Sequence, residues 1–354
     1  MKKTMMIIMV LIATGIGIYY FASKNNPNMT PNIPVSTVQS PTTPTTTVSI
    51  PNAPANTVPS KGIFPSGIYY KEVSNTSQRS ILASINNSLP IRIDIPPGVF
   101  DIHNDQMVIA DNVHTINIYK PDGQTSSVDV KGISFIGRVS LSPNGKQVAV
   151  QASESSTLPI NDLNIYIVNL IDGKYQRISF LPFNEESPEW FHTSNKIAYV
   201  SFSPQDGLMI HVYDADQKKE VLSIANAGGS QIAVSKDDKK ILDPVRLKIY
   251  DAGTGNVITD LKPNVLAGLN KSGYQISTKF PGQANLGTFT LDGDFSKDGK
   301  NIVMDGAVTK NGVEQILMFT VSFDGLNFTV LNTTNVDPSF SNNNNFSQLN
   351  PTWN

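Results

Sequence analysis

Runs of alternating hydrophobic and polar residues recur along the chain, and short polar turns join them in pairs. This alternation is typical of β-strands with one buried face, and the tight turns are typical of antiparallel hairpins. Six hairpins are predicted, at Ile68–Ile85, Thr115–Val130, Leu163–Phe180, Leu208–Ile224, Arg246–Leu261 and Ile316–Asn332. A strand-based unit that recurs about every 40 to 60 residues indicates a closed circular array or a solenoid.

A second pattern, a polar turn followed by a hydrophobic strand, is interleaved with the hairpins. These strands begin at Met107, Val148, Ile197, Ile241 and Ile302. Their turns contain Asn, Asp and Gly, which adopt the positive φ angles of tight hairpins at low cost. Together the two patterns predict four antiparallel strands per repeat, the arrangement of a β-propeller blade.

The turn and the strand after it follow the motif S-x-D/N-G-K-x-I/V, and a strand of the form I-x-hydrophobic-Asp-x-x-x-G comes next. The best matches are Ser142–Val150, Ser235–Leu242 and Ser296–Met304. This motif resembles the WD40-like (PD40-type) repeat of TolB-like β-propellers, over residues 62–354. The turn glycine is missing at Asn104–Asp105 and at Ser194–Asn195. The resemblance implies the fold and says little about activity, because propellers carry many unrelated functions.

The end of the sequence predicts how the ring closes. Asn350–Trp353 resembles the opening strand of a blade, whereas the hairpin Ile68–Ile85 lacks an opening strand of its own. We therefore predict an all-β, six-bladed propeller of four-stranded blades, in which the C-terminal strand completes the N-terminal blade. Such closure removes exposed sheet edges. The alternative is a disordered Asn-rich tail, which the run Asn342–Asn345 favours.

Residues 1–24 predict a cytoplasmic tip followed by a transmembrane signal anchor. Thr4–Ala22 is uncharged and mostly apolar, and its length is close to the ~20 residues that span a bilayer. Lys2 and Lys3 favour a cytoplasmic N-terminus, and Tyr19–Phe21 is typical of a membrane interface rather than of a signal-peptide cleavage site. We therefore expect an uncleaved, single-pass anchor with the propeller outside the cell membrane, in the periplasm or the extracellular space.

Residues 25–60 have the composition of a disordered stalk. They contain eight prolines and eight threonines and no charged residue. Such a segment cannot bury enough apolar surface to offset the entropy lost on ordering. The sequence thus predicts three parts: an anchor at 1–24, a Pro/Thr-rich linker at 25–60 and a β-propeller domain at 61–354.

The amino-acid composition excludes several kinds of functional site and partner. The chain has no cysteine, which excludes disulfides, thiolate metal sites, cysteine nucleophiles and a lipoprotein anchor. Without Lys2, Lys3 and Lys24 it has 24 basic and 29 acidic residues, a net charge of −5. No basic cluster indicates nucleic acid as a partner, and neither a nucleophile elbow nor a phosphate-binding glycine loop is present.

The four histidines, His103, His114, His192 and His211, do not have the spacing of metal ligands. A propeller can bring distant histidines together at its central channel, so spacing alone leaves such a site open. The sequence itself predicts no catalytic residue, no cofactor and no metal site. One weak calcium candidate is the alternating set Asp292, Asp294 and Asp298.

Several long segments separate the predicted strands. They are Ser153–Asn161, Phe183–Ser187, Asp243–Val245 and Asn264–Gly293. Long insertions in compact domains are often functional. The last segment departs most from the repeat, and its Tyr274, Phe280 and Phe289 make it the candidate recognition loop. Core packing of an irregular strand is the alternative.

Three functional hypotheses follow. The first is a membrane-anchored, extracytoplasmic propeller that binds an envelope protein or glycan and catalyses nothing. The second is a structural cell-surface component that associates with itself. The third is a propeller enzyme, a lyase or hydrolase with its site at the channel mouth, which a convergence of His, Asp or Arg side chains there would favour.

Overall fold

A computed structural model describes the chain at residues 67–73, 79–84, 91–93, 98–111, 113–154, 163–181, 184–203, 207–229, 231–277, 290–324, 326–335 and 352–353. All of these belong to one compact unit, residues 57–354. The predicted anchor at Thr4–Ala22 and the stalk at 25–60 lie outside the described residues. Within the described ranges, no helix has the length and apolar character needed to cross a membrane.

The described strands form six antiparallel sheets. Four sheets each contain four consecutive strands: β4 to β7 (Val99–His103, Gln106–Ala110, Thr115–Tyr119, Thr125–Asp129), β8 to β11 (Ser134–Leu141, Gln147–Ser153, Asn164–Asn169, Tyr175–Arg177), β12 to β15 (Glu185–Trp190, Lys196–Ser203, Gly207–Asp214, Lys219–Ala225) and β16 to β19 (Ala233–Val234, Lys240–Asp243, Lys248–Asp251, Val257–Asp260). The fifth contains β20 to β24 (Gln275–Ile276, Thr290–Phe295, Asn301–Lys310, Val313–Ser322, Phe328–Asn335), with both β20 and β21 paired to β22.

The sixth sheet joins the two ends of the described chain. Its order is β25-β1-β2-β3 (Thr352–Trp353, Ile68–Val73, Arg79–Ser84, Ile91–Ile93). β25 pairs antiparallel with β1 through Ile68 with Trp353 and Tyr69 with Thr352. The predicted partnership between the C-terminal strand and the first hairpin is therefore present.

The blade count needs a correction. The sequence predicted six four-stranded blades, five of them continuous and one shared between the N-terminal hairpin and the C-terminal strand, whereas the structure shows five blades, the last of them with five strands. The remaining sheet is smaller, because β25 contributes two residues and β3 contributes three. Its β1–β2 hairpin also takes the second and third places of the sheet. The other five predicted hairpins take the third and fourth places.

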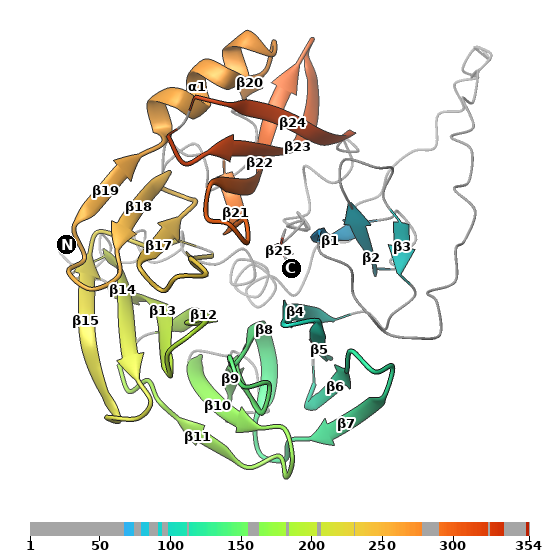
Figure 1. Ribbon diagram of the computed structural model, residues 1–354, viewed down its shortest axis with the longest axis vertical. Helices are drawn as coiled ribbons and strands as arrows, with labels where there is room; N and C mark the ends of the chain where they lie inside the picture. The colour runs from blue at the N-terminus through green and yellow to red at the C-terminus, as the bar shows by residue number, and fades with distance from the viewer. Residues whose placement is uncertain are drawn as a thin grey trace, which may run out of the picture. The chain divides into compact units, whose positions relative to one another are not determined.

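The inner strands contact one another in a circle, in the order β25, β4, β8, β12, β16, β21 and back to β25 (Figure 1). A hydrophobic cluster fills the space between each pair of neighbouring sheets. β1 serves two of these clusters because its side chains alternate: Tyr69 packs with Met107 of the next sheet, whereas Ile68 and Tyr70 pack with Met318 of the previous one. The architecture is that of a β-propeller.

One helix interrupts the expected all-β pattern. α1 (Lys262–Lys271) begins with a proline in its first turn, where the missing N–H costs nothing, and it ends just before Gly273, which has a φ of 77°. Its Val265 and Leu269 are buried in the cluster between the last two blades. The insertion at Asn264–Gly293 therefore begins as a packed helix, and its residues 278–289 lie outside the described part.

Candidate functional site on the turn face and the propeller axis

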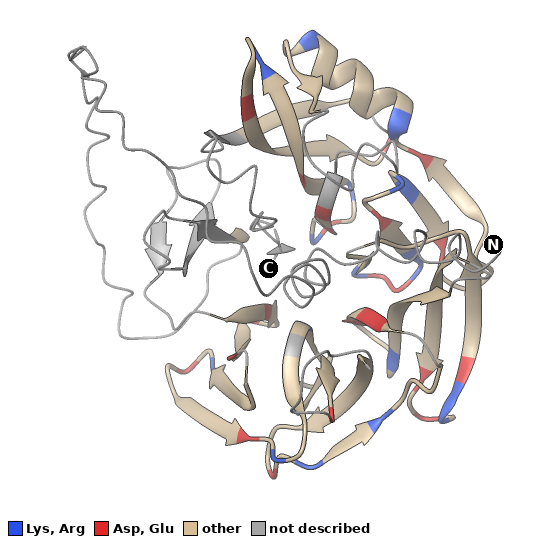
Figure 2. Ribbon diagram, turned by 180° about the vertical axis from the view of Figure 1, so that it is seen from behind, with Lys and Arg blue, Asp and Glu red and all other residues tan. Residues whose placement is uncertain are grey.

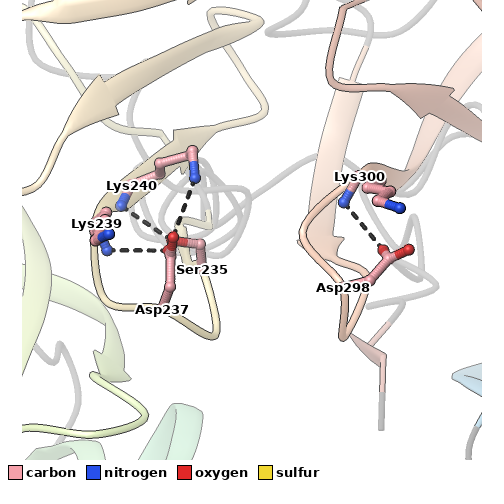
Figure 3. Close-up of polar contacts among 6 residues, drawn as sticks. All are labelled: Ser235, Asp237, Lys239, Lys240, Asp298 and Lys300. Atoms are coloured by element: carbon pink, nitrogen blue, oxygen red, sulfur yellow. Dashed lines mark hydrogen bonds and ion pairs between the residues drawn. The ribbon is translucent and has the colours of Figure 1, made fainter.

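The repeated S-x-D/N motif builds the turns between first and second strands. In the turn between β16 and β17, the Ser235 hydroxyl donates to Asp237 Oδ1 (2.6 Å) and accepts the Lys240 N–H (3.0 Å). Asp237 Oδ1 also accepts the Lys239 N–H (3.2 Å), as Figure 3 shows. The same pattern occurs at Ser142 with Asn144 and at Ser296 with Asp298, and it also occurs outside the first-to-second strand turns, at Ser322 with Asp324 between β23 and β24. The motif thus satisfies the turn's own backbone groups.

Two further departures from the motif, at Thr193 and Asp238, compensate for each other. The turn after β12 has Thr193 where the others have Asp or Asn, so it lacks its own carboxylate. The next blade has Asp238 where the turns after β8 and β21 have Gly145 and Gly299, and Asp238 adopts a φ of 59°. Its carboxylate accepts the N–H of His192 (2.6 Å) and both the N–H (3.0 Å) and the hydroxyl (2.6 Å) of Thr193. One irregular turn is therefore held by its neighbour.

Side chains also join other turns across blades. Between the first and second consecutive blades, Asn104 Nδ2 donates to the Pro143 carbonyl (3.3 Å) and Gln106 Nε2 donates to the Gly145 carbonyl (3.0 Å). We name the surface formed by the five first-to-second strand turns the turn face. It comprises residues 103–106, 142–147, 191–196, 235–240 and 296–301. Side-chain hydrogen bonds thus join the first of these turns to the second and the third to the fourth, so this part of the face is a preformed, polar surface.

Two histidines meet on the turn face. His103 ends β4 and His192 follows β12, so their strands are separated by β8 in the circle. Their Nδ1 atoms are 3.2 Å apart, and the Nε2 of His192 lies 2.9 Å from the carbonyl oxygen of Val234. Burial lowers the pKa of both rings, and the nearby Lys236 lowers both further. Both imidazoles are therefore neutral near pH 7.

The residue two positions before the turn occupies an equivalent place on each inner strand. It is Asp101 on β4, Ser140 on β8, Glu189 on β12 and Asp294 on β21. Asp101 Oδ2 accepts the Leu141 N–H (2.6 Å), and the Ser140 hydroxyl accepts the Trp190 N–H (2.9 Å). These two side chains therefore connect each inner strand to the next, which is a structural role.

Glu189 departs from this arrangement. Its carboxylate has no hydrogen-bond partner among the described residues, and the residue remains partly exposed. Burial raises its pKa well above the usual value, and the charges of Asp101 and Asp294 add to the rise. Burial also raises the pKa of Glu186, on the same strand, to about 7, against the opposing effect of Arg138. Acidic segments on the inner strands are visible in Figure 2.

An ion pair crosses the axis. Arg138 of β8 donates through Nη2 to Asp292 Oδ1 of β21, at 2.5 Å. β8 and β21 are three places apart in the circle of six inner strands, so they lie on opposite sides of the axis. Both residues lie in β-bulges, next to Val139 and Gly293, where each inner strand loses register with its partner. Bulges re-aim side chains, and here they direct opposite charges towards each other.

The predicted site residues are placed as follows. Tyr274 is 6% exposed, packs in the core beside α1, and carries Lys310 Nζ over its ring at 4.3 Å. Phe280 and Phe289 lie outside the described residues. In the calcium candidate, Asp292 pairs with Arg138 and Asp298 belongs to a turn.

The third member of the calcium candidate is also occupied locally. Asp294 Oδ1 accepts the N–H of Phe295 at 2.7 Å. Within the described part of the chain, no group of three or more His, Asp or Glu side chains is arranged to hold a metal ion. The three aspartates thus have separate contacts.

A Ser–His–Glu arrangement occurs elsewhere, on β13 to β15. Ser201 Oγ lies 2.8 Å from His211 Nε2, and His211 Nδ1 lies 2.8 Å from Glu220 Oε2. This order of contacts is that of a hydrolytic triad. Ser201, however, is only 1% exposed and His211 only 4%. A nucleophile must reach its substrate, so the arrangement is a satisfied polar network within one blade.

Comparisons with known proteins concern the fold. No protein-family model matches the sequence, and no curated protein matches it. Structural neighbours of the chain include TolB proteins. The TolB structure from Acinetobacter baumannii has 15% identity and a TM-score of 0.43, over 78% of this chain and 55% of that one. A putative TolB from Agrobacterium tumefaciens has 13% identity and a TM-score of 0.47, over 77% and 91%. This chain thus spans about half the length of the first.

Proposed function

We propose that this chain is a membrane-anchored, extracytoplasmic β-propeller that binds a protein or glycan of the cell envelope and does not catalyse a reaction. In this proposal the sheet β25-β1-β2-β3 acts as the sixth blade and completes the ring. The anchor at Thr4–Ala22 holds the propeller at the membrane, and the stalk at 25–60 separates the two.

The cross-bonded turn face is the observation that supports binding. Turns from different blades are joined by side-chain hydrogen bonds, including those of Asn104 and Asp238. A surface that is already ordered loses little conformational entropy when a partner docks, so more of the contact energy appears as affinity. Exposed lysines project from three of these turns, at Lys146, Lys239 and Lys300.

The buried Ser–His–Glu network supports a non-catalytic role. Ser201 has the neighbours that would activate a nucleophile, yet its hydroxyl is enclosed by the protein. On the axis, Arg138 is paired with Asp292, and Asp101 is engaged with backbone N–H groups. The hydrogen bonds and the ion pair of these side chains therefore connect the blades to one another.

Charge reversal on the turn face tests the proposal. The variant carries Lys146→Glu, Lys239→Glu and Lys300→Glu, which change exposed side chains and leave the turns' backbone bonds in place. The control carries the same charge change on exposed lysines elsewhere, at Lys131, Lys262 and Lys271. Binding of each purified full-length chain to isolated envelope fractions is then titrated.

We expect the turn-face variant to bind at least tenfold more weakly than both the control and the unaltered chain. Equal binding by all three would exclude the turn face as the binding surface. Concentration-dependent self-association, measured by analytical ultracentrifugation and abolished by the same variant, would instead favour the structural cell-surface component.

A further inference from the structure

The two turn-face histidines are close enough to act on one ligand atom. The Nδ1 atoms of His103 and His192 are 3.2 Å apart, their ring planes are inclined by 22°, and their ring centroids are 5.1 Å apart. Their positions in the sequence are 89 residues apart. The fold alone therefore brings these two nitrogens together.

The hydrogen bond of His192 defines which of its nitrogens is available. A backbone carbonyl can only accept, so the Nε2 of His192 donates its proton to the Val234 oxygen at 2.9 Å. In a neutral ring the Nδ1 then has a lone pair, and this lone pair faces His103. A metal-binding histidine typically has this arrangement, with the second ring N–H held by a carbonyl or a carboxylate.

The distance between the two Nδ1 atoms and the distance between the two ring centroids are close to those of two imidazoles bound to one metal ion. Nitrogens bound to a tetrahedral Zn²⁺ at about 2.05 Å lie ~3.3 Å apart, which puts their ring centroids ~5.1 Å apart. A straight N–H···N bond of the observed length would put the centroids ~5.5 Å apart. The observed centroid separation of 5.1 Å is close to the value for a shared ion, and a bent N–H···N bond between these rings has the same separation.

We propose that His103 and His192 bind a divalent transition-metal ion, of which Zn²⁺ is the reference, through their Nδ1 atoms. His103 then carries its proton on Nε2. The backbone fixes His192, whose N–H donates to Asp238 at 2.6 Å. The carboxylates of Asp101 and Asp238 near His103 favour a cation, and Lys236 opposes it.

The site has open coordination positions. Within the described residues no third histidine or carboxylate completes it, so water or an external ligand would fill two positions of a tetrahedral ion, one more than in an open zinc site with three protein ligands. Imidazole ligands bind Cu²⁺ and Ni²⁺ more tightly than Co²⁺ in the usual order of divalent ions. This inference is independent of the proposed partner binding.

Metal titration of the full-length, chelator-treated chain tests the inference. Zn²⁺ is titrated by calorimetry, and Co²⁺ is used as a spectroscopic probe, because a bound Co²⁺ ion reports its coordination through visible absorption. We expect one equivalent to bind, and we expect His103→Phe to weaken binding at least tenfold. The control is His114→Phe, which alters an exposed histidine and should leave binding unchanged.

A second readout separates ligand loss from misfolding. Zn²⁺ should raise the midpoint of thermal unfolding of the unaltered chain and of His114→Phe, because a ligand of the folded state stabilises it. His103→Phe should unfold cooperatively without responding to Zn²⁺. Failure of the unaltered chain to bind either metal, or equal binding by a folded His103→Phe, would overturn the proposal.

Discussion

The carboxylate of Asp238 accepts hydrogen bonds from both the backbone N–H and the hydroxyl of Thr193, which belongs to the preceding blade. Asp238 occupies the position of Gly145 and Gly299 in two other turns, and Thr193 occupies the position of the Asp or Asn in the S-x-D/N motif. Each of these two residues departs from the motif of its own repeat. The carboxylate that holds the turn at Thr193 is therefore supplied by Asp238 of the neighbouring blade.

Replacing Asp238 with glycine should therefore destabilise the propeller, although glycine fits the motif and the positive φ. The N–H groups of His192 and Thr193 would lose their acceptor, which we expect to cost about 1–2 kcal/mol. Urea unfolding measures the change, with Asp238→Asn as a control that keeps both an acceptor oxygen and a tolerance for positive φ. Unchanged or greater stability in Asp238→Gly would refute this account of the turn.

The ion pair across the axis should be energetically coupled. Arg138→Met leaves Asp292 buried without its cation, so we expect the free energy of unfolding to fall by about 3–5 kcal/mol. Asp292→Asn should be milder, because it removes the charge that Arg138 compensates. The double variant should be less destabilised than the sum of the two single variants. Simple additivity in urea unfolding would show that the contact contributes nothing of its own.

The pKa of Glu186 predicts a pH dependence. Its folded pKa of about 7 exceeds the ordinary 4.5, so the folded state binds more protons than the unfolded state between those values. Stability from this group is present below pH 4.5 and is lost as the pH rises towards 7. Glu186→Gln should flatten that decline in stability with pH. At pH 8 its free energy of unfolding should exceed that of the unaltered chain by on the order of 1 kcal/mol. This is less than the full pKa shift implies, because Glu186 is partly exposed and solvent screens its charge.

Unfolding curves from pH 5 to pH 8 provide the measurement. Glu154→Gln, which alters an exposed glutamate, serves as the control and should follow the unaltered chain. If Glu186→Gln shows the same decline with pH as that control, the raised pKa is not a property of Glu186.

The predicted anchor has its own test. Leu11→Arg places a charge at the middle of Thr4–Ala22, which costs about 2.5–3.5 kcal/mol for membrane insertion. We expect the variant to move from the alkali-resistant membrane fraction to the soluble fraction. Leu11→Val should stay with the membrane. Release of the unaltered chain by alkali would contradict the anchor.

The hairpins and turns of the blades could be predicted because their signals are local. A turn such as Ser235–Lys240 forms its hydrogen bonds within six residues, and the alternation of the next strand follows from one buried face. α1 was missed because its segment contains Pro263 and Gly268, which look like loop residues. β3 was missed because three residues carry too little alternation to recognise.

The contacts across the axis depend on the ring and were not predicted. One signal was present: Arg138 and Asp292 each lie four residues before a turn serine, at Ser142 and Ser296. Equivalent positions on opposite blades with opposite charges are candidates for an axial pair. The meeting of His103 with His192 has no such signal, because it requires two inner strands to converge past a third.

The pairing of β25 with β1 has a consequence for biosynthesis. A ribosome makes Ile68 long before Trp353, so the first sheet stays without its innermost strand until nearly the whole propeller has been made. Five blades can stack in turn as they emerge, whereas the last seam waits for a contact between distant segments, which is entropically slow to form. During that interval Ile68 and Tyr69 present an open sheet edge, so chaperone binding should be concentrated on the nascent chain at this edge.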